Sequence, residues 1–218
     1  MHIADSVQQE WETQLIESFL DLVKAPDGEF GSIRRLSNAT KDAYSLDLMV
    51  EFLSRHPQGK QAFEQRPVLG DVDLQQLHQL PENTLGYLFA NHMFKNGLTP
   101  LKPSNMPDDD RSFLMWHITE THDIWHVVTG SNTNITGEIE LEAFYVAQLF
   151  ASRFWLALLC KNLFKAALQN VEISHQYMDA LVKGWLLGKQ AQPLFGIQWN
   201  TLWETPLSTL RNQLNINL

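Results

Sequence analysis

Hydrophobic side chains recur three or four residues apart along most of the chain, whereas the alternating pattern of strands is scarce. This spacing predicts helices over about residues 6–24, 46–53, 84–96, 108–128, 138–168 and 174–189, with one or two helical turns between 68 and 80. Ser6 and Thr84 suit helix N-caps, and Asn96-Gly97 suits a helix C-terminus. Thr205-Pro206 predicts a last helix, because proline fits the first helical position.

The whole chain, residues 1–218, is predicted to form one all-α domain. No repeat, low-complexity tract or long linker divides the sequence. A chain of this length can bury a sufficient hydrophobic core without disulfides. The expected architecture is a single-domain helical bundle with a long central helix, from about Glu138 to Leu168, and an apolar pocket.

Composition narrows the classes of partner. The chain is 44% hydrophobic and 19% charged, with a net charge of −9 and no cluster of basic residues. The apolar content excludes intrinsic disorder, and the acidic balance argues against nucleic acid as a partner. The single cysteine, Cys160, cannot form an internal disulfide, so we expect a reducing compartment and a small core residue at this position.

The sequence also gives expectations about membranes. Its N-terminus lacks the basic start and apolar run of a signal peptide. The most apolar stretch, residues 143–160, is interrupted by Gln148 and Arg153, which makes it too polar for a membrane-spanning helix. We therefore predict a cytoplasmic protein without a transmembrane helix, with peripheral attachment to a membrane as an open alternative.

The residues most suggestive of chemistry are His122, Asp123 and His126, followed after eleven further residues by Glu138. On a helix, His122 and His126 lie one turn apart and point in similar directions, so both rings can reach one divalent ion. Asp123 lies on the same flank, and an antiparallel return of the chain would bring Glu138 opposite the histidines. This mixed nitrogen and oxygen donor set suits Zn²⁺ or Fe²⁺ and is compatible with Mg²⁺ or Mn²⁺.

Three other interpretations fit parts of this pattern. The two histidines could serve only as hydrogen-bonding groups, because such a pair is often incidental. A zincin-like hydrolase has glutamate where this chain has Asp123, whose shorter side chain would displace the general base. Di-iron helix bundles need two Glu-x-x-His motifs, and this chain supplies one, Glu172-x-x-His175.

The wider pattern resembles the coenzyme Q (ubiquinone) biosynthesis proteins of the fourth named type. Their H-D-x2-H-x11-E motif matches His122, Asp123, His126 and Glu138. Other segments similar to the family, which together extend over a motif-bearing core of about residues 75–215, are Leu80–Gly86, Thr133–Ile139, Trp203–Pro206 and Leu210-Arg211. Arginines that often precede the motif are replaced here, and Glu142-Ala143 stands where the family has a Lys-Trp pair. The chain thus resembles a divergent, bacterial-like member.

The resemblance implies that the four motif residues hold one divalent metal ion, with zinc favoured and magnesium or iron as alternatives. It also implies a prenylated ligand, either a polyprenyl lipid or a quinone precursor. Other quinone-biosynthesis enzymes are the implied protein partners. A homodimer is a further expectation, because most soluble oligomers are symmetric assemblies of one chain.

The apolar sequence after Glu138 offers a place for the prenyl tail. Its pattern alone favours a core helix, because apolar residues surround it almost completely. With the family resemblance, we predict that the tail lies beside this helix, where small residues leave room. The predicted lining residues are Ala143, Ala147, Phe150, Ala151 and Phe154.

Two functions follow from these expectations. In the first, which the sequence favours, the chain binds a polyprenyl lipid beside the metal ion and organises biosynthetic enzymes. In the second, the ion takes part in oxidative decarboxylation or hydroxylation of the ring of a prenylated hydroxybenzoate, which requires an open coordination position. The sequence assigns no catalytic residue.

Overall fold

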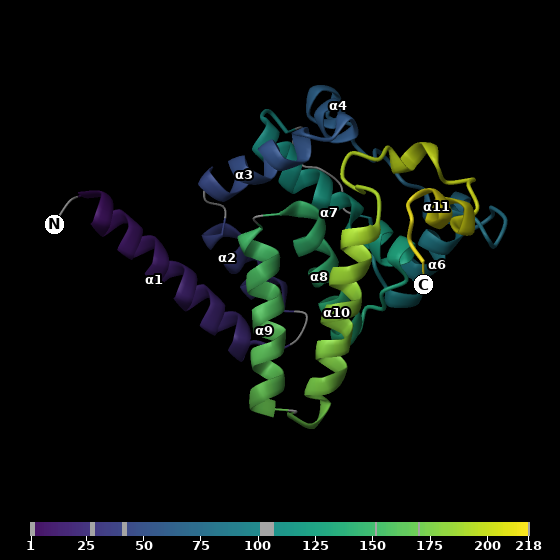
Figure 1. The fold of residues 1–218 in the computed structure, drawn as a ribbon. Helices are drawn as coiled ribbons and strands as arrows, with labels where there is room; N and C mark the ends of the chain where they lie inside the picture. The colour runs from purple at the N-terminus through teal and green to yellow at the C-terminus, as the bar shows by residue number, and fades with distance from the viewer. Residues whose placement is uncertain are drawn as a thin grey trace.

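A computed structural model describes residues 3–26, 29–40, 43–100, 107–150, 152–169 and 171–217. These ranges contain helices and no strand, which confirms the predicted all-α class (Figure 1). No helix within them is long and apolar enough to cross a bilayer. The α-helices are α1 Ile3–Lys24, α2 Phe30–Ala39, α3 Ala43–Ser54, α4 Pro57–Gln65, α5 Leu74–Leu77, α6 Leu85–Asn96, α7 Asp110–Thr129, α8 Ile135–Leu149, α9 Arg153–Gln169, α10 Ser174–Gln190 and α11 Leu207–Gln213, with 3-10 turns η1 Val171–Ile173 and η2 Trp199–Thr201.

Most predicted helices are confirmed, and their ends follow local capping chemistry. The Thr84 hydroxyl accepts a hydrogen bond from the N–H of Tyr87, and Gly97 ends α6 with a φ of 64°. Two helices, α2 and α4, were not predicted, and α1 begins at Ile3, before Ser6. Pro57 opens α4, because proline is compatible with the first helical turn.

The predicted long central helix is wrong, because α8 and α9 replace it. Phe150 takes φ 62° and ψ −127°, a conformation that no α-helix continues. The Ser152 hydroxyl then accepts a hydrogen bond from the N–H of Trp155, so α9 begins with its own N-cap. The Phe150 ring stacks on that of Phe52 in α3, with the ring centroids 5.0 Å apart. This tertiary contact contributes to the break between α8 and α9.

Two segments far apart in the sequence lie side by side and fix the C-terminal region. The N–H of Leu85 donates to the carbonyl of Thr205, and the N–H of Gly86 donates to the carbonyl of Trp203, at 2.9 and 2.8 Å. From α11, the Arg211 guanidinium donates to the carbonyls of Val127 and Val128 at the end of α7. Groups left unpaired at the ends of α6 and α7 are thereby satisfied by the C-terminal segment.

The closest helix packing joins α8 to α10, which lie side by side in Figure 1. An added Cβ at Gly184 would collide with the carbonyl oxygen of Glu140, and one at Gly188 would lie 2.8 Å from the Cβ of Ala147. The two glycines are one turn apart on α10, so they form a smooth surface on which the α8 backbone rests. This approach holds α8, and with it Glu138, in one register.

Replacing Gly184 by alanine is therefore expected to destabilise the fold by about 2–3 kcal/mol through overpacking. In an exposed helix the same substitution would stabilise, because glycine is a poor helix former. Chemical denaturation measures the change, with the exposed α10 substitution Gln176→Ala as the control. A Gly184→Ala variant as stable as the wild type would contradict the close packing.

Candidate metal centre

Helix packing brings three of the predicted ligands together. His122 and His126 lie one turn apart on α7, and Glu138 lies in the first turn of α8. One ligand atom from each of these residues lies within 4.8 Å of the other two. The antiparallel return that the sequence predicted, through the turn at residues 130–134, thus places the carboxylate opposite the histidine pair.

His126 is held in one tautomer. Its ring is almost completely buried, and its Nδ1 lies 3.0 Å from the backbone carbonyl of Ser131. Since a carbonyl only accepts, Nδ1 carries a proton, which leaves Nε2 as the ring nitrogen that can ligate a metal. Nε2 lies 3.4 Å from Oε1 of Glu138, whose side chain is 34% exposed. Donation of one ring N–H to a backbone carbonyl, with the other ring nitrogen facing the candidate site, is typical of metal-ligating histidines.

His122 is held by aromatic neighbours. Its Nδ1 lies 3.3 Å from the hydroxyl of Tyr145, and its ring stacks near those of Tyr145 and Trp155. Burial, and secondly the positive charge of His126, lower the pKa of His122 to about 4. The imidazole is therefore neutral at physiological pH, which is the form that binds a metal.

Glu138 and His126 change each other's pKa: the pKa of the carboxyl group is lowered and that of the imidazole is raised. Burial by itself would raise the pKa of Glu138, but the hydrogen bond and charge of His126 outweigh it and leave the pKa below its ordinary value. Burial would likewise lower the pKa of His126, and Glu138 reverses that effect, so the pKa is raised. The carboxylate is thus ionised in a partly buried position beside two imidazoles, which a cation would stabilise.

This donor set fits a divalent ion. Two ligands about 2.1 Å from a tetrahedral ion are about 3.4 Å apart, which matches the separation of His126 Nε2 and Glu138 Oε1. Two histidines and one carboxylate occur in catalytic zinc sites and in non-haem iron sites, both of which keep open positions. Chemically, the arrangement can bind an ion and leave room for an exogenous ligand.

The structure places Asp123 differently from the other motif residues. Its Oδ1 lies 3.6 Å from Nε2 of His92 on α6, and Asp123 is absent from the ligand group formed by the described residues. A direct ligand role for Asp123 stays a prediction. His92, whose ring lies 5.7 Å from that of His126, was not linked to the site by sequence spacing, because only the packing of α6 on α7 brings it there.

Comparison with known proteins agrees with the motif. The family model described as coenzyme Q (ubiquinone) biosynthesis protein Coq4 matches residues 1–218. The chain belongs to the Coq4 family. Similar curated proteins are the mitochondrial ubiquinone biosynthesis protein COQ4 homologue of Aedes aegypti, 27% identical over 80% of this chain, and COQ4 of Eremothecium gossypii, 29% identical over 73%. This chain spans 64% and 50% of their respective lengths.

A solved structure shares the Coq4-family fold. A crystal structure from Nostoc punctiforme PCC 73102, of a protein named for ubiquinone biosynthesis, superimposes with a TM-score of 0.84 at 26% identity. The match covers 95% of this chain and 99% of that one. The fold is thus shared over nearly the full length of both chains.

Next to the candidate metal centre of this Coq4-family chain lies a buried acid, Glu142, one turn after Glu138 on α8. Both of its carboxyl oxygens accept hydrogen bonds from the side-chain amide of Asn162 on α9, at 3.1 and 2.9 Å. Burial raises the pKa of Glu142 to about 8, against the lowering effect of Asn162. At neutral pH this side chain is mainly a neutral carboxylic acid.

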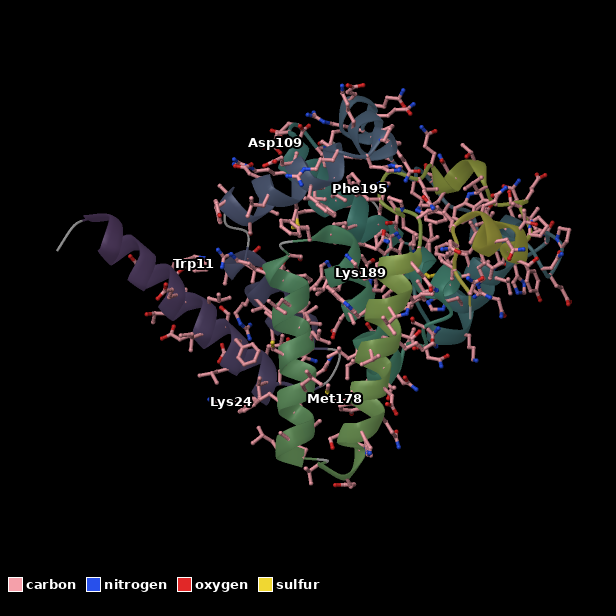
Figure 2. All side chains as sticks on the ribbon, in the orientation of Figure 1. Trp11, Lys24, Asp109, Met178, Lys189 and Phe195 are labelled. Atoms are coloured by element: carbon pink, nitrogen blue, oxygen red, sulfur yellow. The ribbon has the colours of Figure 1, made fainter. Side chains whose placement is uncertain are left out.

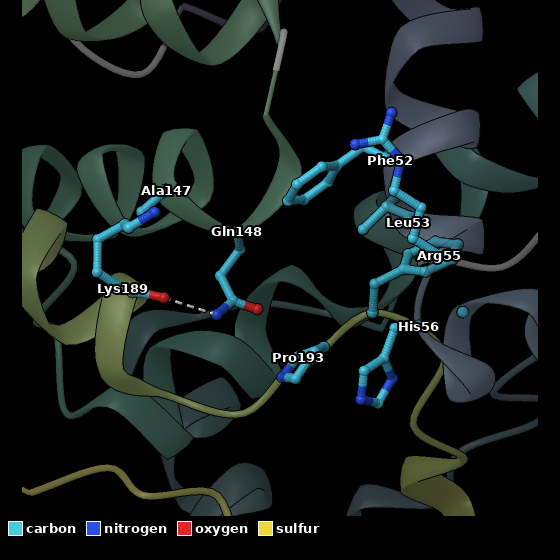
Figure 3. Close-up of a pocket in the computed structure, with 11 residues that line it drawn as sticks. Phe52, Leu53, Arg55, His56, Ala147, Gln148, Lys189 and Pro193 are labelled. Atoms are coloured by element: carbon cyan, nitrogen blue, oxygen red, sulfur yellow. Dashed lines mark hydrogen bonds between the residues drawn. The ribbon is translucent and has the colours of Figure 1, made fainter.

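The predicted lipid-lining residues lie in different surroundings. Ala143 is buried between α8, α9 and α10, and Phe154 packs edge-on against Trp155. Phe150 is half exposed, and Ala151 lies outside the described residues. Ala147 lines a pocket of about 350 Å³ (Figure 3), whose walls include Phe52, Leu53, Arg55, His56, Gln148, Lys189, Pro193 and Phe195.

That pocket is separate from the candidate metal centre. Ala147 lies nine residues after Glu138, about 13 Å further along α8. The Gln148 amide shapes one wall by donating to the carbonyl of Gly188 and accepting from the N–H of Leu194. The predicted apolar pocket is therefore partly polar, with Arg55, His56 and Lys189 among its walls.

Substitution of Asp123 by asparagine tests its position. Because its carboxylate contacts His92 and not the ligand group, we expect Asp123→Asn to weaken Zn²⁺ binding less than about tenfold, whereas Glu138→Gln weakens it by about 100-fold or more. Competition with a chromophoric chelator measures both affinities. Equal losses in the two variants would instead make Asp123 a ligand.

Glu142 gives a pH-dependent prediction. The folded chain keeps its proton up to a pKa of about 8, whereas the unfolded chain releases it near 4.5, so this group lowers stability as pH rises through that range. Glu142→Gln, which mimics the protonated acid, should become more stable relative to the wild type between pH 5 and 8.5, by on the order of 2–4 kcal/mol. Urea denaturation measures the difference. The exposed substitution Glu172→Gln should show no such trend.

Proposed function

We propose that this Coq4-family chain acts in isoprenoid-quinone biosynthesis by holding one divalent metal ion with His122, His126 and Glu138 and binding a prenylated precursor beside it. The convergence of these three ligand atoms, with Nδ1 of His126 already held by the Ser131 carbonyl, carries the proposal. Family membership and the names of the relatives support the quinone pathway.

Each residue has a defined part in this proposal. The Ser131 carbonyl orients His126, the aromatic neighbours keep His122 neutral, and Glu138 supplies the negative charge. Since Glu138 is partly exposed, a ligand can approach the ion from that side. When bound, the ion would supply Lewis-acid polarisation of an oxygen on the precursor. Zinc is the favoured ion, with magnesium and iron as alternatives.

The prenyl tail is proposed to lie along α8. Ala147 and the pocket near the end of this helix offer apolar wall from Phe52, Leu53 and Phe195. The exposed Phe150, stacked on Phe52, stands beside this wall. A tail that began near Glu138 would therefore have apolar surface available at the other end of the same helix. Other biosynthetic proteins are proposed partners, with this chain as their organiser.

A second function is favoured by the donor set itself. Two histidines with one carboxylate, and Asp123 turned toward His92, match the ligands of non-haem iron oxygenases. We propose as the alternative that the chain catalyses oxidative decarboxylation or hydroxylation at the ring of a prenylated hydroxybenzoate. The neutral acid Glu142, one turn from Glu138, would then be available as a hydrogen-bond donor to a bound ring.

Native mass spectrometry with elemental analysis tests the proposal. We expect about one metal ion per chain in the wild type and a prenyl lipid that co-purifies. His122→Ala and Glu138→Ala should lose at least most of the metal, because each removes a ligand. The control variants His175→Ala and Glu172→Ala replace the same residue types at exposed positions on other elements, and they should retain the metal. Equal metal content in all variants would reject the centre.

The identity of the metal separates the two functions. Zinc or magnesium with a retained lipid supports the binding function. Iron that supports oxygen consumption with a prenylated hydroxybenzoate supports the enzyme, and loss of that consumption in Glu138→Ala is the required control. A wild type that binds none of these ions after reconstitution would overturn both functions.

A further inference from the structure

An exposed apolar surface covers one side of the hairpin formed by α9, η1 and α10, and the metal centre does not use it. On α9, Leu156, Cys160, Phe164 and Leu168 recur every fourth residue and are all exposed. The prediction that Cys160 is a core residue is therefore wrong. On α10 the exposed apolar residues are Met178, Val182, Trp185 and Leu186. We call these eight side chains the hairpin face. Its seven large hydrophobic members are 42–62% exposed.

The two stripes lie on the same side of the hairpin. Partly buried Leu163 and Leu181 pack against one small cluster between α8, α9 and α10. Successive residues of an α-helix are rotated by about 100° around its axis. In this angular order Leu163 of α9 lies between buried Leu159 and exposed Leu156. Around α10, Leu181 lies between buried Tyr177 and exposed Trp185 in the same way. Because the helices are antiparallel neighbours (Figure 1), both stripes continue from this seam onto the side away from α8.

The hairpin also differs in charge from the rest of the chain. Residues 153–190 contain five lysines and arginines against two acidic residues, whereas the remaining residues contain eleven against 23. Lys183 is paired with Glu140 of α8, and the other four basic residues still outnumber the two acidic ones. Lys189 places its Nζ 5.8 Å from the ring of Trp185, near the end of the hairpin face (Figure 2). Apolar residues, tryptophan and flanking lysines on one helical surface are typical of interfacial binding to anionic bilayers.

We propose that the hairpin face docks this chain on an anionic phospholipid bilayer, with the apolar side chains inserted among the lipids and the basic residues near the head groups. This inference rests on the proposed function in one respect, because a prenylated precursor resides in a bilayer. The acidic side chains Glu10, Glu12, Glu17 and Asp21 belong to α1, on the other flank of α9, so charge orients the hairpin and not α1 toward the membrane.

A second copy of the chain is the less suitable occupant. Two-fold pairing through the hairpin face would set each positively charged hairpin against its equal. An anionic bilayer offers the opposite charge and also accepts the apolar side chains. Charge complementarity thus selects the membrane.

Cys160 allows a direct test, because it is the single cysteine and lies within the hairpin face. The wild-type chain, labelled there with an environment-sensitive fluorophore, is mixed with vesicles of phosphatidylcholine containing about 30% phosphatidylglycerol. We expect vesicle flotation and a blue shift of the emission, both weakened by salt. The matched control carries the label at Tyr44→Cys in a Cys160→Ser background. Tyr44 is exposed on α3, and the emission there should not shift.

A double variant tests the side chains themselves. Phe164→Ser with Trp185→Ser should lower the vesicle partition coefficient by about tenfold or more, whereas Tyr44→Ser with Phe94→Ser, an exposed aromatic pair outside the hairpin, should change it by about twofold at most. The docking inference is overturned if the wild type does not float, if the Cys160 label does not shift, or if both double variants bind equally.

Two further measurements distinguish membrane docking from dimerisation and from failure of the proposed metal site. Light scattering that shows a dimer, converted to a monomer by Phe164→Ser with Trp185→Ser, together with no vesicle binding, would assign the hairpin face to a second copy. Metal content of the same variant reports on the proposed function independently. Loss of vesicle binding with full metal content supports docking and leaves the centre intact, whereas wild-type metal content without vesicle binding rejects docking alone.

Discussion

The close contact of α8 with α10 is the constraint on which the candidate metal centre depends. The backbone of Glu140 packs directly against Gly184, which has no side chain. The Glu140 carboxylate forms an ion pair with Lys183 and accepts a hydrogen bond from the hydroxyl of Ser131. The backbone carbonyl of the same Ser131 orients His126. These contacts connect the packing of α8 on α10, the turn before α8 and the orientation of the His126 ring. A shift of α8 would therefore disturb all three.

Burial of charge explains why a cation suits this centre. Glu138 is ionised in a partly buried position, and His122 is neutral because burial disfavours its charged form. A proton on Nε2 of His126 partly offsets the charge of this carboxylate, and a divalent ion could take the place of that proton. A divalent ion would neutralise the carboxylate and satisfy both nitrogens, so binding of metal would be linked to stability of the fold.

Helices α8, α9 and α10 bring together the features that the proposed functions need. The first turn of α8 contributes Glu138, its last turn lines the pocket, and its middle rests on α10. The break at Phe150 turns the chain into α9, which would not lie beside α8 in one continuous helix. That break therefore allows Asn162 of α9 to pair with the buried Glu142 of α8.

The sequence by itself determined the helical class, most helix positions and the pairing of His122 with His126, because periodicity and i, i+4 spacing are local properties. It also predicted Glu138 opposite the histidines, since the capped turn at Asn134 is short and specific. Local rules missed the end of α8, because no glycine or proline marks it and its aromatic stacking on Phe52 is a long-range contact. The tertiary structure alone decided that Asp123 turns to His92, that Cys160 is exposed and that Ala147 lines a pocket. Each of these depends on which helix packs against which face, and that choice is made by contacts between residues distant in the chain.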